Sequence, residues 1–205
     1  MKATQAPSKA PAGTRERILS AAFVEFYKHG FQGGSLNHIV ETAGTTKGAL
    51  FHHFEGKQEL GYAVVDEIIT PLLKQRWLDP LTHSTNPIAE LKRAFRQFVK
   101  EDIDSGAWIQ GCPLNNLAQE MSPLDDGFRQ RIDALYETWR QCFATAFSDG
   151  IKAGKVNKKV SPQSVAALVV AAQMGIWGTG KSSQNQDLMI QASEALFSYL
   201  DSLKP

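Results

Sequence analysis

Residues 35–54 read S-L-N-H-I-V-E-T-A-G-T-T-K-G-A-L-F-H-H-F, and this pattern predicts two short helices separated by a tight turn. Apolar residues recur at helical spacing in the first half, and Gly44 then supplies the left-handed residue that ends a helix. Ser35 is the expected N-cap of the first helix, and Thr46 is the expected N-cap of a second helix over residues 47–53. The stretch therefore predicts a helix-turn-helix, a motif that reads DNA.

The second helix is expected to present one polar face. At 100° per residue, Leu50 and Phe54 share an arc that must face the core, which leaves Gly48 and His52 on the opposite arc. A glycine inside a helix costs roughly 1 kcal/mol relative to alanine. Gly48 is best explained if a larger side chain would hold the helix away from a surface such as the base edges of a major groove.

Positive charge is concentrated near the motif. The whole chain has a formal net charge of +1, but residues 1–60 hold seven Lys and Arg against five Asp and Glu, and the remainder holds fifteen against sixteen. Between Glu25 and Glu55 the only acidic residue is Glu41. Phosphates would meet little repulsion there, although a polar helical hairpin with solvated charges is the alternative interpretation of the motif taken alone.

A longer pattern surrounds the motif. Residues 14–31 read T-R-E-R-I-L-S-A-A-F-V-E-F-Y-K-H-G-F, and the motif itself continues into E-G-K-Q-E-L up to Leu60. This segment, about a quarter of the chain, resembles the N-terminal domain of TetR-family transcriptional regulators, with the first helix, the turn, the H-F pair and Lys57 in family register. The resemblance implies a dimeric, ligand-responsive repressor with three DNA-binding helices and a larger helical effector domain.

The resemblance also assigns DNA contacts to single residues. Thr46 and Lys57 match the family's phosphate-contacting positions. Ser35 is also expected to contact DNA. The groove-facing positions are matched by Thr45, Lys47, Gly48, Phe51 and His52. Phe51 departs from the tyrosine that is usual at its position, so the phenolic hydroxyl that commonly bonds a phosphate is absent.

The remainder of the chain also shows helical spacing, without strand alternation or repeats. We expect an all-α fold of about nine helices, with a flexible arm at residues 1–13, a helix-turn-helix domain at 14–60 and a helical ligand-binding and dimerisation domain at 61–205. Outside the motif, the first helix is expected to end at Gly30, and another helix is expected from Lys57 to about Trp77. A further helix should start at Pro87. The remaining helices are expected over residues 113–121, 125–153, 162–180 and 187–203.

Small residues predict a dimer interface near the C-terminus. Ala167, Ala171, Gly175 and Gly178 form a smooth stripe that allows another helix to approach closely. Packing against the last helix of the same chain is the alternative. The resemblance implies instead that the last two helices form a four-helix dimer interface, and two copies would read a palindrome through grooves about 34 to 36 Å apart.

A ligand pocket is expected in the larger domain, although aromatic residues at helical spacing are also typical of ordinary core. The candidate lining residues are Trp77, Phe95, Phe98, Trp108, Cys112, Trp139, Phe143 and Trp177. The sequence does not identify the small-molecule inducer.

The two cysteines suggest different roles. Pro113 suits a first helical position, so Cys112 is expected at an N-cap, where free amides and the helix dipole favour a thiolate. A reactive thiolate there would make a thiol-reactive inducer the expected signal. A buried structural thiol is the alternative for Cys112, and Cys142 is expected to be an inert core thiol. A stable disulfide is not expected.

Other classes of protein find little support in the sequence. The composition is that expected of a soluble cytoplasmic protein without a secretory signal or membrane anchor. No phosphate loop, G-x-S-x-G elbow or H-E-x-x-H motif occurs, and the adjacent His52 and His53 diverge by about 100° on a helix, so neither an enzyme, a cofactor nor a metal site is expected. The remaining alternative is a helical protein-binding adaptor that keeps a degenerate helix-turn-helix. The expected partners are an operator in double-stranded DNA, a small-molecule inducer and a second copy of the chain.

Overall fold

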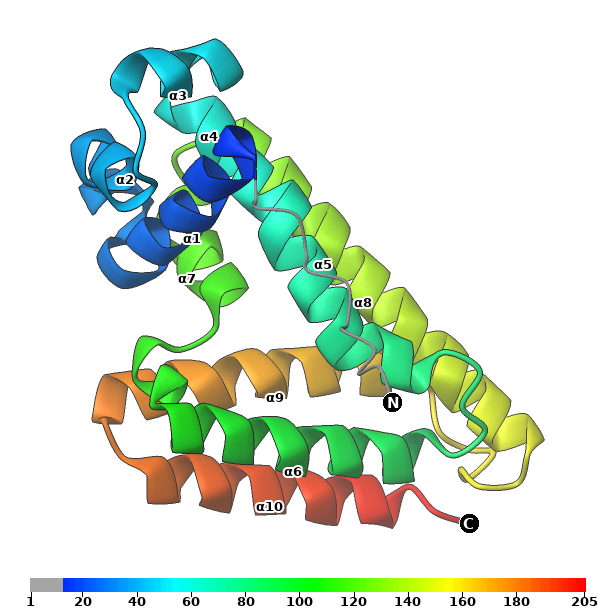
Figure 1. The fold of residues 1–205 in the computed structure, drawn as a ribbon. Helices are drawn as coiled ribbons and strands as arrows, with labels where there is room; N and C mark the ends of the chain where they lie inside the picture. Colours follow the sequence, from blue (N-terminus) through cyan, green and yellow to red (C-terminus); the bar gives the residue numbers. More distant parts are fainter. Residues whose placement is uncertain (1–12) are drawn as a thin grey trace, which may run out of the picture.

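A computed structural model describes residues 13–205, in which helices are joined by turns and loops and no β-strand occurs (Figure 1). The arm predicted over residues 1–13 lies outside the described part except for Gly13. The helices are α1 (Thr14–Gly33), α2 (Leu36–Thr42), α3 (Lys47–His53), α4 (Lys57–Val64), α5 (Thr70–Leu73), α6 (Pro87–Ser105), α7 (Pro113–Met121), α8 (Asp126–Lys152), α9 (Pro162–Ser183) and α10 (Gln186–Ser202).

Helices α4 and α5 belong to one long rod. Wide π-helical turns at Val65–Ile69 (η1) and Lys74–Leu78 (η2) continue the helix before and after α5. Pro71, near the start of α5, lacks the N–H that an α-helix would pair, so a local change in helical geometry is expected there. Counted with this rod, and apart from short 3-10 helices at Asp79–Leu81 (η3) and Ala107–Gln110 (η4), the described residues form nine helices. This confirms the predicted all-α fold and the predicted helix from Lys57 to the region of Trp77.

The helix-turn-helix forms as its sequence predicts. Gly44 has a φ of 58° and ends α2. The Ser35 side chain accepts a hydrogen bond from the His38 N–H, and the Thr46 side chain accepts one from the Ala49 N–H at 3.2 Å. Both expected N-caps are thereby confirmed, and α3 covers the predicted residues 47–53.

The end of α1 combines the predicted break with an additional turn. Gly30 ends the regular helix, as predicted, with a φ of 75° and a ψ of 167°, and a separate short turn follows it to Gly33. The kink removes helical partners from the next amides, and the carboxylate of Glu120 on α7 replaces them by accepting hydrogen bonds from Phe31 N–H and Gln32 N–H, both at 2.8 Å. A partner 88 residues away therefore accepts the hydrogen bonds of this last turn.

The remaining helices form a layered body below the motif. The α4–α5 rod runs beside α8, whereas α6, α9 and α10 lie together at the other end of the molecule (Figure 1). Helix α9 packs against both α8 and α10 and continues past the predicted end at Gly180, to Ser183. None of the helices between residues 13 and 205 combines the length and apolar character that a bilayer crossing requires.

Candidate functional site

Helix α3 carries an exposed polar face at the tip of the molecule, remote from α6 and α10 (Figure 1). Leu50 is fully buried, whereas Lys47, Gly48 and His52 are exposed and the Phe51 side chain is about half exposed. A Cβ at Gly48 would lie 3.8 Å from Thr46 Oγ1, which is an ordinary contact. The protein itself therefore does not require a glycine at this position.

The flanking positions differ in how firmly the protein holds them. Thr46 is exposed, and Thr45 is half buried with its N–H donating to Val40 O. The Lys57 ammonium donates to Gln32 O at 2.9 Å and lies 5.2 Å from the centre of the Phe31 ring. An ammonium has three donors, so Lys57 retains capacity for a phosphate.

A buried carboxylate joins α1 to α2. Glu25, 5% exposed, accepts hydrogen bonds from Ser35 N–H at 2.8 Å and from His38 Nδ1 at 2.5 Å, and His29 lies 4.0 Å away. Burial alone would raise the pKa of Glu25, but the hydrogen bonds from Ser35 and His38 outweigh it and lower that pKa. Sequence reasoning missed this contact, because one glutamate on an amphipathic helix resembles any solvated charge.

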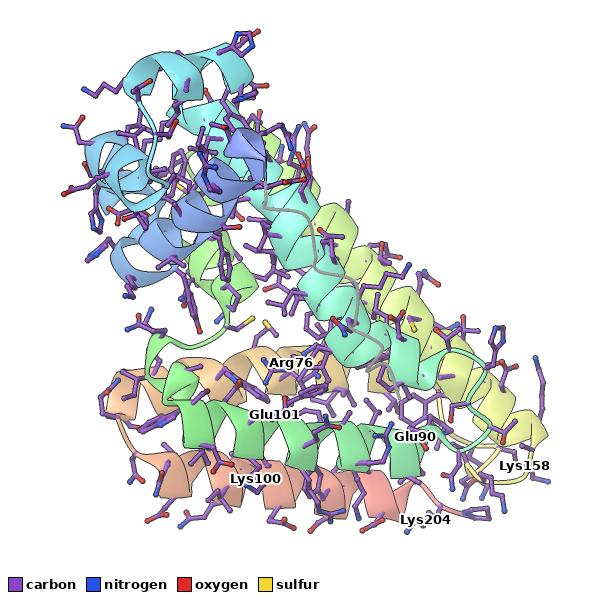
Figure 2. The ribbon with its side chains drawn as sticks, viewed as in Figure 1. Arg76, Glu90, Lys100, Glu101, Lys158 and Lys204 are labelled. Carbon is purple, nitrogen blue, oxygen red and sulfur yellow. The ribbon has the colours of Figure 1, made fainter. Side chains whose placement is uncertain are left out.

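A cavity of about 150 Å³ lies where α1 meets the larger domain. Figure 2 labels Arg76, which comes from the end of the long rod nearest to α6 and α9. Of the predicted lining residues, Trp77, Cys112 and Trp177 border the cavity. Its other walls are Phe23, Tyr27, Leu72, Leu73, Arg76, Asp102, Ala107, Gly111, Pro113, Gln173 and Met174.

The other predicted pocket residues lie elsewhere. Phe95, Trp139 and Phe143 are at most 1% exposed, pack in the core and do not border this cavity. Phe98 borders a neighbouring surface hollow, and Trp108 packs against the core without bordering the cavity. Helical periodicity identifies a buried face, but it does not distinguish a filled core from a cavity wall.

The cavity contains a polar cluster that sequence reasoning missed. Asp102 accepts hydrogen bonds from Arg76 Nη2 and Trp177 Nε1, both at 2.6 Å. Gln173 is completely buried, and neither its Oε1 nor its Nε2 has a hydrogen-bond partner within the protein. Arg76 Nε is likewise buried without a partner. The sequence signal for this cluster was the side-chain amide of Gln173, which lies within the apolar run of residues 165–177.

The cavity wall includes part of the first helix. Tyr27 on α1 donates its hydroxyl proton to Gly111 O at 2.6 Å, just before α7. Burial raises the pKa of Tyr27, so the phenol remains a donor. The cavity thus adjoins both the helix that supports the motif and the start of α7.

Cys112 is the N-cap residue of α7, as predicted, and its side chain is buried. Burial raises the pKa of the thiol more than the Leu114 and Asn115 amides lower it. Desolvation therefore outweighs the helix-end effect, which favours the alternative of a buried structural thiol. Cys142 is half buried, burial raises its pKa too, and both cysteines are free.

The predicted small-residue stripe lies largely in the open. Ala167, Ala171 and Gly175 are exposed, and a Cβ at Gly175 would meet nothing within 4 Å. Gly178 is half buried, and a Cβ there would lie 3.5 Å from the Asn115 side chain, so this glycine turns inward. Gly175 also lines a shallow, mainly apolar hollow between α9 and α10. Its other lining residues are Leu168, Ala172, Ile176, Thr179, Ala192, Ala195, Leu196 and Tyr199.

No group of three His, Cys, Asp or Glu side chains within residues 13–205 is arranged to hold a metal ion. The rings of the neighbouring His52 and His53 are inclined by 63°.

Comparison with known proteins gives two family matches. Residues 18–64 match the model for bacterial regulatory proteins of the tetR family, and residues 87–196 match the model for the tetracyclin repressor-like C-terminal domain. The chain is 26% identical over 188 residues to the HTH-type transcriptional repressor DhaR of Mycobacterium sp. (strain GP1), covering 91% of each protein. It is 32% identical over 131 residues to the HTH-type transcriptional regulator LmrA of Bacillus subtilis (strain 168), covering 63% of this chain and 69% of that protein.

Solved structures show the same fold. A TetR transcriptional regulator from Chloroflexus aurantiacus superposes with a TM-score of 0.79 at 24% identity, covering 92% of this chain and 94% of the other. The regulatory protein TetR from Rhodobacter sphaeroides superposes with a TM-score of 0.79 at 21% identity, covering 90% and 97%. Since the C-terminal match alone spans more than half of the 205 residues, the chain belongs to the TetR family of bacterial regulatory proteins, which are DNA-binding transcriptional regulators rather than enzymes.

Proposed function

We propose that the protein is a homodimeric repressor that binds a palindromic operator through α3 and leaves it when a small molecule occupies the cavity beside α1. The observation that carries the DNA part is the exposed polar face of α3, with a glycine that the fold itself does not require. DNA binding is further supported because residues that match the family's DNA-contacting positions are exposed. The relatives DhaR and LmrA are named as a transcriptional repressor and a transcriptional regulator.

On this proposal, each α3 enters a major groove. Lys47, Gly48 and His52 face base edges, and Phe51 offers an apolar contact of the kind that suits a thymine methyl group. Thr45 lies at the edge of the same face. Thr46, Lys57 and Ser35 contact the sugar-phosphate backbone and fix the register of the helix.

The second copy binds through α9 and α10. Ala167, Ala171 and Gly175 form an exposed smooth surface, and Leu168 beside them is 47% exposed. Two such faces packed about a twofold axis make a four-helix contact. This contact holds the two α3 helices at a spacing that lets them enter successive major grooves of DNA.

The inducer site is the cavity. Its walls come from α1, from the rod, from α6 and α9 and from the start of α7, so a bound molecule touches the helix that supports the motif. Regulation follows if occupation changes the position of α1 relative to α7.

Selection from random duplexes tests the DNA part. The purified protein is incubated with a random pool at low salt, and we expect enrichment of a palindrome. Absence of retention would support the protein-binding adaptor instead.

The salt dependence of operator binding then tests Lys57. If Lys57 contacts one phosphate per subunit, Lys57→Ala should reduce the slope of log K against log salt by roughly 1.8, or 0.9 for each copy, and weaken all sequences alike. Lys158→Ala is the matched control, since Lys158 is exposed at the far end of the molecule (Figure 2). An unchanged slope in Lys57→Ala would remove Lys57 from the interface.

A further inference from the structure

We propose that the cavity beside α1 recognises a small uncharged molecule that presents an N–H donor next to a carbonyl acceptor, as a lactam or carboxamide does. This inference rests on the proposed function, because it assigns a chemical class to the inducer. Three features of the cavity support it.

The first feature is the buried amide of Gln173. Both its Oε1 and its Nε2 lack a partner within the protein, although the residue is completely buried and borders the cavity. Buried amides are normally paired, because an unpaired one loses its hydration without compensation. A group with adjacent donor and acceptor satisfies both atoms at once, whereas a ketone or an alkane leaves the Oε1 unpaired.

The second feature is the charge balance. Arg76 and Asp102 are the charged groups that border the cavity, and they form an ion pair with a 2.6 Å hydrogen bond. The pair is neutral overall, and Trp177 Nε1 occupies the other oxygen of Asp102. A carboxylate ligand would place a second acceptor against Gln173 Oε1, so the site favours an uncharged molecule. The free Arg76 Nε is available as a further donor to the carbonyl.

The third feature is size. Apolar cavities of about 150 Å³ hold benzene, which is a single six-membered ring. The present cavity has a similar volume, with walls from Phe23, Leu73, Trp77, Met174 and Trp177. It therefore suits a molecule of about one ring, with its polar edge toward Gln173 and its apolar body against the aromatic side chains.

Three small cyclic molecules, two with six-membered rings and one with a five-membered ring, test the assignment. The full-length protein, without DNA, is titrated with 2-piperidone, which has the donor and the acceptor, with cyclohexanone, which has the acceptor alone, and with the anion cyclopentanecarboxylate. Isothermal calorimetry and the shift in Tm give the affinities, since a ligand of the folded state raises Tm. We expect 2-piperidone to bind on the order of tenfold more tightly than either of the other two, which is the contribution of about one buried hydrogen bond.

Gln173→Leu separates the polar contact from the shape of the cavity. This variant replaces an unpaired buried amide by an apolar side chain of similar size, so it should fold and its Tm without ligand should not fall. The preference for 2-piperidone over cyclohexanone should disappear in it. Gln163→Leu, at an exposed position of the same helix, should keep the preference.

The outcomes distinguish the two proposals. Equal affinities for 2-piperidone and cyclohexanone in the wild type, or an undiminished preference in Gln173→Leu, would overturn the ligand class. Binding of cyclopentanecarboxylate alone would overturn it as well. A failed duplex selection together with the expected lactam preference would refute the repressor while the ligand class stands.

Discussion

One methyl group separates Gly48 from the alanine that would make α3 a better helix. A Cβ there meets only Thr46 Oγ1, at 3.8 Å, so the protein has room for it. The surroundings within the chain thus give no reason for the glycine, whereas the proposed approach of α3 to DNA does.

Gly48→Ala should therefore stabilise the free protein and weaken the complex. We expect unfolding free energy to rise by up to about 1 kcal/mol, the difference in helix propensity. Operator affinity should fall by roughly 1 to 3 kcal/mol, the range of a well-placed base contact, and the preferred sequence should change. Thermal unfolding and operator titration of one preparation measure both.

Gly33→Ala is the control for that experiment, because a Cβ there meets His29 Cβ at 3.9 Å and nothing nearer, and the position is outside α3. It should leave sequence preference unchanged. Normal operator binding by Gly48→Ala would show that α3 does not approach DNA closely.

At the scale of helices, the sequence predicts helix starts and ends best where neighbouring residues in the chain determine them. Ser35, Gly44 and Thr46 act through neighbours within three residues, and their roles in starting and ending helices are confirmed. Leu50 and Phe54 face the core as their spacing predicts, with exposures of 0% and 2%.

The features that the sequence did not predict depend on distant partners. Gly30 ends the regular helix as its sequence predicts, but the sequence did not predict the turn beyond it, whose amides donate to Glu120. The cavity joins residues of five separate segments, so spacing within one helix predicted Trp77 and Trp177 but also placed core residues such as Trp139 in the pocket.

The joint between α1 and α2 has a pH dependence with a defined sign. The folded-state pKa of Glu25 is lowered from 4.5, so its ionised form stabilises the fold above the unfolded-state pKa, and this contribution is lost as the pH falls through the folded value. Glu25→Gln should cost about 1.5 to 3 kcal/mol at pH 7, typical of hydrogen bonds to a charged group, and should flatten the acid side of the stability curve.

Urea unfolding of Glu25→Gln between pH 3 and 7 is the measurement. Glu41→Gln changes a glutamate that is exposed in α2 and should alter little. A stability loss in Glu25→Gln that stays the same across this pH range would show that Glu25 acts by packing and not by charge.

At the scale of the whole molecule, the proposed dimer depends on a surface that one chain leaves uncovered. A Cβ at Gly175 meets nothing within 4 Å, so a larger residue fits the single chain. In a twofold contact the same residue would face the partner, and burying an ion there costs several kcal/mol.

Gly175→Arg should therefore give helical monomers with weak operator binding. Sedimentation measures the association state, circular dichroism the helical content, and titration the operator affinity. Ala134→Arg, at an exposed position of α8, should remain dimeric. A dimeric Gly175→Arg protein would place the interface elsewhere.

The contact between Glu120 and the end of α1 limits how such regulators can be recombined. Phe31, held by that contact, packs its ring 4.7 Å from Phe128 at the start of α8, and Phe128 also lies 4.9 Å from Tyr62 on α4. A fragment that ends at residue 60 would lose the hydrogen-bond acceptor for the last turn of α1 and would expose Phe31. A chimera that joins residues 61–205 to the DNA-binding domain of another regulator must therefore restore this contact. It needs an acceptor at position 120 and an aromatic ring at position 128 that fit the new first helix.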